Sequence, residues 1–200
     1  MIFTSAEIDE FCRNSGDTNP LHSDASFAKM NGFDDRVVPG MLAVSKMLGD
    51  RQPKTLRAKF VEPLYPNVEY PECFKLESNR LWIGGNQKKT IIWLDGAVRC
   101  AQEVFGPITG AFGSSFNSFR SHVFNWVSWF VGTQHPGHGA VLSNVEIYFH
   151  DQSNESINSV DYSAMTQENR DIGVMVIDAM LIARNCMATC QITAFLPRKP

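Results

Sequence analysis

Residues 15–24 read SGDTNPLHSD, and Asp17, Asn19 and His22 bring an acid, an amide and an imidazole close together in the chain. Pro20 lies between the acid and the imidazole, so a helix cannot run through this stretch. A tight loop shaped by proline can aim both side chains at one point, where they could remove a proton from water and return one. Histidine suits this exchange because its ordinary pKa is close to neutrality. The alternative is that Asp17 and Asn19 only stabilise a turn and that His22 lies on the surface.

Helical signals flank this loop on both sides. Thr4 and Glu7 have the spacing of a capping box, which predicts a helix that ends near Gly16. Pro39 suits the entry of a second helix, and the apolar residues that follow predict a mostly buried helix that ends at Gly49.

Most of the remaining chain has the pattern of β-strands between turn signals. We expect strands at 55–61, 68–76, 81–83, 90–94 and 97–103, and again at 140–149, 159–165, 173–184 and 185–195. Asp95–Gly96 is typical of a hairpin turn. Residues 110–115 are expected to form a flexible bend, and the apolar residues from Phe116 to Phe130 follow helical spacing.

A short internal repeat divides the chain. Gly49 and Pro53 stand between an apolar helix and a long strand, and Gly132 and Pro136 recur with the same separation. The pattern predicts two copies of one unit, a curved antiparallel sheet around an apolar helix, over residues 1–105 and 106–200. Chance is the alternative, because a glycine and a proline coincide easily.

Composition excludes several classes of protein. Apolar residues make up 44% of the 200 residues and charged residues 20%, which allows a buried core. The net charge of −3 argues against electrostatic binding of nucleic acid, and no apolar run is long enough to span a membrane. The N-terminus lacks the pattern of a signal peptide, and the five cysteines lack the spacing of a zinc or redox motif. We therefore expect a cytoplasmic protein.

No metal or cofactor is expected. His135 and His138 lie in one turn, but no third ligand is evident, and zinc needs three or four. The glycines at 106, 110 and 113 match neither a dinucleotide-binding motif nor a phosphate-binding loop.

The segment SGDTNPLHSD, followed by FAKMNGFDDRVVPGMLA, resembles the MaoC-like hydratase/dehydratase family, which includes (R)-specific enoyl-CoA hydratases. The resemblance runs from about residue 4 to about residue 101. It implies a hotdog fold, in which a curved antiparallel sheet wraps a central helix, and the internal repeat then predicts a fused double hotdog of the α+β class. It also implies that Asp17 and His22 are the catalytic pair and that Asn19 organises the loop.

The resemblance further implies a substrate-binding role for Gly40 and Met41 at the start of the central helix. The backbone N–H of Gly40 would donate to a thioester carbonyl, because glycine allows close approach and a helix start offers an unpaired N–H. Many relatives have histidine just before this glycine, whereas this chain has Pro39. The implied activity is the addition or removal of water between a 2-enoyl and a (R)-3-hydroxyacyl thioester of coenzyme A or acyl carrier protein.

The second half lacks the catalytic motif, so we expect one active and one degenerate copy. Its aromatic residues could wall an acyl pocket or form an ordinary core; they are Phe116, Phe119, Phe124, Trp126, Trp129 and Phe130. A fused pair is able to stay monomeric or to form a homodimer. Two other functions stay open: a hotdog acyl thioesterase, although neither predicted central helix carries the carboxylate expected there, and a non-catalytic acyl-thioester-binding protein.

Overall fold

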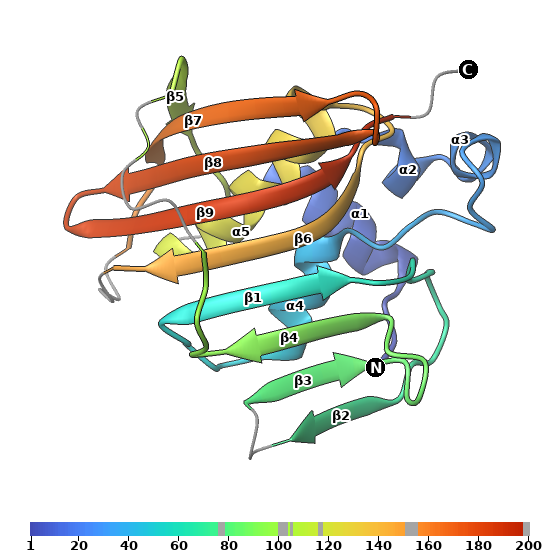
Figure 1. The fold of residues 1–200 in the computed structure, drawn as a ribbon. Coiled ribbons are helices and arrows are strands. Elements are labelled where there is room, and N and C mark those ends of the chain that lie inside the picture. Colours follow the sequence, from blue (N-terminus) through green and yellow to red (C-terminus); the bar gives the residue numbers. More distant parts are fainter. Residues whose placement is uncertain (76–78, 100–103, 105, 116–117, 151–155, 198–200) are drawn as a thin grey trace.

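The computed structural model describes residues 1–75, 79–99, 104, 106–115, 118–150 and 156–197. One antiparallel sheet of nine strands dominates the described part, in the order β2-β3-β4-β1-β6-β9-β8-β7-β5 (Figure 1). The strands are β1 (Thr55–Phe60), β2 (Glu72–Lys75), β3 (Arg80–Ile83), β4 (Thr90–Leu94), β5 (Ile108–Phe112), β6 (Val141–Phe149), β7 (Val160–Asn169), β8 (Val174–Ala183) and β9 (Cys186–Phe195).

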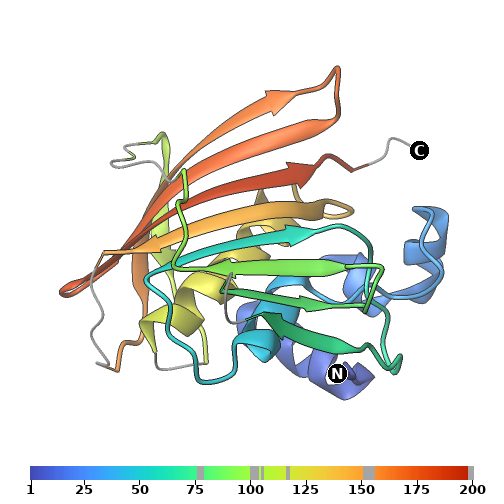
Figure 2. The same ribbon diagram turned by 60° about the horizontal axis from the view of Figure 1, so that its bottom comes forward.

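The helices lie together on one face of this sheet (Figure 2). They are α1 (Ser5–Ser15), α2 (Pro20–Ser23), α3 (Ala25–Met30), α4 (Gly40–Leu48), α5 (Phe119–Trp129) and a π-helical turn, η2 (Phe130–Gln134). The predicted capping box is present at Thr4 and Glu7, and Gly16 ends α1 in the left-handed conformation that glycine adopts at least cost. Within the described residues, no helix is long and apolar enough to cross a membrane.

Apart from the edge strand β5, the order of the strands is symmetrical about the pair β1–β6. Leu56 of β1 lies opposite Ile147 of β6. Each of these two strands follows a helical segment in the chain. In the first half, β1 pairs with β4, the last strand of the meander β2-β3-β4, and in the second half β6 pairs with β9, the last strand of the meander β7-β8-β9. This arrangement agrees with two copies of one helix-and-sheet unit. The division at residue 105 stays a prediction, because residue 105 lies outside the described residues.

The core lies between the sheet and the helices. Ala58, Ile92 and Ile147 alternate with outward-facing residues on their strands and are fully buried. Val44 of α4 and Trp126 of α5 meet them from the helical layer and are also fully buried. The period-two strands and apolar helices of the sequence thus form two packed layers.

Two expectations about local structure are wrong. Asp95–Gly96 does not join two paired strands: Asp95 instead accepts a hydrogen bond from the Lys54 N–H at 2.7 Å, and the next described residues, 97–99, form no strand. The rest of that expected strand, 100–103, lies outside the described residues. The expected bend contains the edge strand β5, where a Cβ at Gly110 would lie 2.7 Å from the Tyr162 hydroxyl, so glycine permits pairing beneath this ring.

Candidate active site

Asp17 lies in the loop after α1, and its side chain is almost fully buried. Its Oδ1 accepts a hydrogen bond from the Asn19 N–H at 3.0 Å, and its Oδ2 accepts one from the Ser128 hydroxyl at 2.6 Å. The first bond is local to the loop, whereas the second comes from α5 in the other half of the chain. Both oxygens are therefore fixed in direction, and the carboxylate is preorganised.

Gly132 allows the carboxylate of Asp17 to lie where it does. A Cβ at this position would be 2.3 Å from Asp17 Oδ1, much closer than two such atoms can approach. Ser128 and Gly132 are four residues apart, so they face the acid from neighbouring turns of the α5–η2 segment. Together they form a cradle for the acid on the second half of the chain.

Asn19 joins the loop to the start of β6. Its Oδ1 accepts hydrogen bonds from the N–H groups of Leu21 at 3.2 Å and Gly139 at 3.0 Å, and its Nδ2 donates to the Ala140 carbonyl at 3.0 Å. It also caps α2, whose first residue is Pro20. This polar side chain is buried with its hydrogen bonds made, and these bonds attach the loop to the start of β6.

His22 is oriented by one strong hydrogen bond. Its Nδ1 lies 2.7 Å from the Val37 carbonyl, which can only accept, so Nδ1 carries a hydrogen. The other ring nitrogen, Nε2, points toward Asp17 and lies 3.7 Å from its Oδ2. The acid and the imidazole therefore converge, and the alternative of a surface histidine fails because only 12% of the His22 side chain is exposed.

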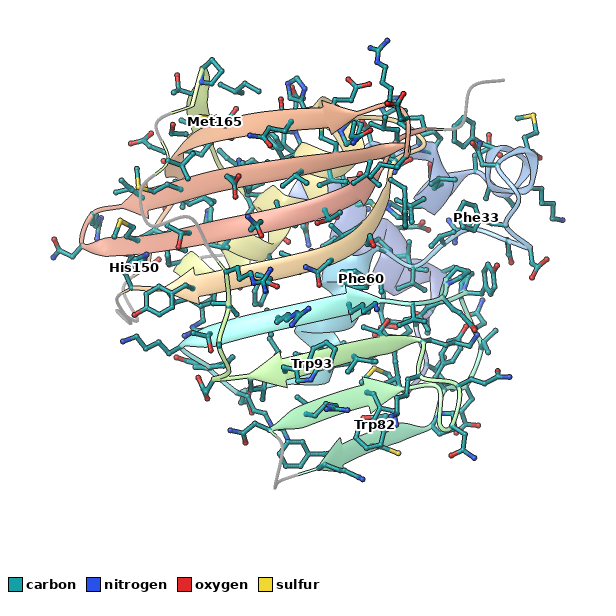
Figure 3. All side chains as sticks on the ribbon, in the orientation of Figure 1. Phe33, Phe60, Trp82, Trp93, His150 and Met165 are labelled. Atoms are coloured by element: carbon teal, nitrogen blue, oxygen red, sulfur yellow. The ribbon has the colours of Figure 1, made fainter. Side chains whose placement is uncertain are left out.

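A cavity of about 140 Å³ opens beside this pair. Asp17, His22 and Ser128 contribute the polar wall near the pair, and most of the remaining wall is apolar. Both halves of the chain line it; the apolar residues are Leu21, Phe33, Val37, Val38, Ala43, Phe60, Val61, Pro63, Leu64, Val131, Ala140, Val141, Leu142 and Phe195. Figure 3 shows Phe60 at the end of β1 and Phe33 on the segment between α3 and α4.

Gly40 begins α4 and lines the same cavity. Pro39 precedes it without forming a side-chain cap, so no capping side chain takes the N–H groups of the first turn. A Cβ on Gly40 would lie 2.9 Å from the Phe60 ring and 3.2 Å from Leu142, which explains the glycine. The start of α4 thus lies against β1 and β6, with its positive dipole end at the cavity.

Part of the sequence matches a known protein family. The sequence of residues 1–67 matches the family described as the MaoC like domain. This part of the chain is MaoC-like. A curated relative, the mitochondrial 3-hydroxyacyl-[acyl-carrier-protein] dehydratase of Arabidopsis thaliana, is 39% identical over 64 residues, which are 32% of this chain and 36% of that protein. The chain thus spans about a third of the length of this relative.

Solved structures of low sequence identity share the fold. A putative oleoyl thioesterase from Lactobacillus plantarum has a TM-score of 0.59 at 8% identity and covers 100% of this chain and 95% of its own. A putative MaoC domain protein dehydratase from Chloroflexus aurantiacus has a TM-score of 0.58 at 9% identity, with 100% and 93% covered. A protein from Alicyclobacillus acidocaldarius with a described hot dog fold has a TM-score of 0.54 at 11% identity, with 96% and 99% covered. The chain has the hotdog fold.

Two groups of residues lie elsewhere than the sequence suggested. The side chain of Met41 is fully buried in the core and is not part of the cavity wall. The aromatic residues of α5 and η2 do not wall the cavity either: Trp126 stacks on Phe130 with centroids 4.6 Å apart, and the others pack in the same core. The helix turns these rings toward the sheet. Phe116 lies outside the described residues.

The remaining polar groups near the MaoC-like loop are structural. His138 Nε2 lies 3.0 Å from the Thr18 hydroxyl, and Thr133 accepts a hydrogen bond from the Thr18 N–H at 3.0 Å. The described residues contain no group of three potential metal ligands. Burial, together with the nearby charge of Asp17, raises the pKa of the Cys12 thiol to about 12, so Cys12 is a packing residue.

Sequence reasoning missed Ser128 and Gly132. The repeat drew attention to Gly132 as the end of a helix, but not to the acid that it accommodates. Serine in an apolar helix gives no local signal, because its partner is 111 residues away in the chain.

Proposed function

We propose that this MaoC-like protein is a hydratase/dehydratase that adds or removes water between a 2-enoyl thioester and a (R)-3-hydroxyacyl thioester. The observation that carries this proposal is the convergence of Asp17 Oδ2 and His22 Nε2, 3.7 Å apart, beside a largely apolar cavity whose wall includes Gly40. The pair supplies an acid and a base, and the cavity supplies a largely apolar space for an acyl group.

In the hydration direction, Asp17 accepts a proton from a water molecule held between the two side chains. The resulting hydroxyl forms a bond to the β-carbon of the enoyl group, and the electron pair of the double bond moves toward the thioester carbonyl. His22 gives a proton from its Nε2 to the α-carbon. The proton on Asp17 then passes to His22, which restores both groups. Dehydration follows the same steps in reverse.

Gly40 stabilises the enolate-like oxygen that forms between these steps. Its N–H, at the start of α4, donates to this oxygen, and the positive end of the helix dipole favours the developing charge. One donor of this kind typically contributes ~3 kcal/mol to the transition state. Pro39 leaves this role intact, because the role belongs to the backbone of the next residue.

In this proposal, the second half of the chain acts as a degenerate partner. It carries no second acid–imidazole loop, but it contributes Ser128 and Gly132 to the first. Residues 106–200 would then replace the second subunit of a hotdog pair, and a further homodimer is not required for the site to be complete.

The test is a panel of 2-enoyl-CoA substrates of increasing chain length, followed by the loss of ultraviolet absorbance of the conjugated thioester. We expect hydration, with the (R)-3-hydroxyacyl product identified by chiral chromatography. Release of free thiol without hydration would instead indicate a thioesterase, and binding without turnover would indicate a non-catalytic acyl-binding protein.

A further inference from the structure

The cavity extends from the catalytic pair across three neighbouring strands of the sheet. Asn19 attaches the catalytic loop at Ala140, beside the start of β6. Gly40 lies close to β6 and β1, because a Cβ added to it would be 3.2 Å from Leu142 and 2.9 Å from Phe60. Thr90, on β4, lies opposite Phe60 and lines the same cavity on the side of β1 away from β6. The order along the cavity is therefore the catalytic pair, then Gly40, then Thr90.

This order fixes the direction of a bound thioester. The carbonyl carbon lies between the α-carbon and the sulfur. If the β-carbon faces Asp17 and His22 and the carbonyl oxygen accepts from Gly40, the sulfur and its arm lie on the far side of Gly40. That side is where Thr90 lies.

Thr90 is polar in an apolar stretch. It is 1% exposed, it pairs with Phe60 of β1, and most of the cavity wall to which it belongs is apolar. Among the described residues, no hydrogen-bond partner of its hydroxyl occurs. Thr90 lines the cavity, so its hydroxyl is available to a polar group that enters the cavity. We take this available hydroxyl as a sign that Thr90 binds a ligand.

An exposed part of the cavity wall lies next to Thr90. The N–H of Val61 donates to the Lys89 carbonyl, which places residue 61 beside the start of β4. Val61 lines the cavity and is 49% exposed, so an arm that passes Thr90 reaches solvent there.

We propose that Thr90 binds the amide nearest the sulfur in a pantetheine arm. Two methylenes separate this amide from the sulfur, and the amide is the first polar group that the arm presents after the thioester. Coenzyme A and acyl carrier protein share this arm. The inference rests on the proposed function for the direction of the substrate, and it makes Thr90 a residue that selects the thiol and not the acyl group.

The test compares two enoyl thioesters in wild type, Thr90→Val and Thr90→Ser. One is the N-acetylcysteamine thioester of 2-butenoic acid, which retains the amide. The other is the S-pentyl thioester, which has methylenes in its place. Thr90→Val should lower kcat/KM for the amide substrate about 10-fold and leave the S-pentyl substrate within about 2-fold, as expected for one lost hydrogen bond. Thr90→Ser should restore most of the difference.

Ser128→Ala serves as the control, because a change near the reacting atoms should lower the turnover of both substrates alike. An equal loss on both substrates in Thr90→Val, or no loss on either, would overturn the assignment of Thr90. The saturated butanoyl analogues of the same two thiols, measured by ligand-observed NMR, test the contact without turnover. Wild type should prefer the amide analogue about 10-fold and Thr90→Val should lose this preference; lack of binding of either analogue, or an unchanged preference, would also overturn it. Failure of turnover with a normal binding preference would contradict the proposed reaction alone.

Discussion

Ser128 donates a hydrogen bond of 2.6 Å to Oδ2 of Asp17, the same oxygen that faces His22 Nε2 at 3.7 Å. One residue of the acid–imidazole pair is thus positioned by a helix from the opposite half of the chain. The MaoC-like segment supplies the acid and the imidazole, and the second half supplies the serine that holds the acid.

Ser128→Ala tests this support. Removing the hydroxyl leaves Asp17 Oδ2 without its donor, so we expect a fall of about 10- to 100-fold in kcat, since a hydrogen bond to a charged group contributes ~1.5–3 kcal/mol. KM should change less than kcat, because Ser128 contacts the acid and the substrate is held elsewhere. Steady-state kinetics check the split, and Ser128→Thr, which keeps a hydroxyl, should recover part of the loss. An unchanged kcat in Ser128→Ala would show that the bond has no role in turnover.

Gly132→Ala tests the close approach to Asp17. The added methyl would lie 2.3 Å from Oδ1, so the carboxylate has to move away from His22. We expect a loss of more than ~100-fold in kcat/KM, since small misplacements of catalytic groups have effects of this size. The overpacked site should also lower the free energy of unfolding by ~1–3 kcal/mol.

Gly96→Ala is the matched control, because a Cβ there meets no atom within 4 Å. It should retain wild-type activity and near wild-type stability in urea unfolding. Equal activity of the two alanine variants would contradict the proposed geometry around Asp17.

Glu7 gives the N-terminal helix a pH-dependent anchor. Its hydrogen bond to Lys46, and then that to the Thr4 backbone, lower the pKa of Glu7 from its ordinary value of 4.5. A lowered folded-state pKa stabilises the fold above the unfolded-state pKa, and this stabilisation is lost as the pH falls through the folded-state value. Glu7→Gln should therefore cost stability at pH 7 and progressively less below pH 4.5.

Urea unfolding at several pH values measures this difference. Glu10→Gln, an exposed position on the same helix, is the control and should show a smaller effect at pH 7. A stability difference for Glu7→Gln that stays constant from pH 7 to about pH 3 would refute the role of the ion pair with Lys46.

Cys12 should be unreactive in the folded protein. With a pKa of about 12, only about one molecule in 10⁴ carries the thiolate at pH 8, and the thiolate is the reactive form. Iodoacetamide labelling, read by mass spectrometry of the Cys12 peptide, should be at least ~100-fold slower in buffer than in urea. Rapid labelling of folded protein would show that the thiol is neither buried nor influenced by Asp17.

Local signals in the sequence explain how much of this could be predicted. The capping box at Thr4, the apolar helix after Pro39 and the strand at 90–94 are each encoded within a few residues, and the structure confirms them. The motif around Asp17 is equally dense, so the convergence of acid and imidazole could be predicted from the loop.

Features that depend on distant contacts could not be predicted. The residues next to Asp95 are typical of a hairpin turn, yet its side chain accepts a hydrogen bond from the Lys54 N–H on another segment. The aromatic stripe of α5 fits a pocket or a core equally well until the sheet beneath it is known. Ser128 lies beside Asp17, and Thr90 lines the cavity, only because strands and helices that are distant in the sequence pack together.

The most direct test of the central claim is the rate of hydration of a 2-enoyl thioester by Asp17→Asn, measured beside wild type. The amide is nearly the same size as the acid but cannot accept a proton, so the fold should be kept and kcat should fall by ~10²–10⁴-fold. Thermal unfolding within a few degrees of wild type would confirm that the fold is intact. Near-normal turnover by the folded variant would contradict the account, because the proposed chemistry begins with proton transfer to Asp17.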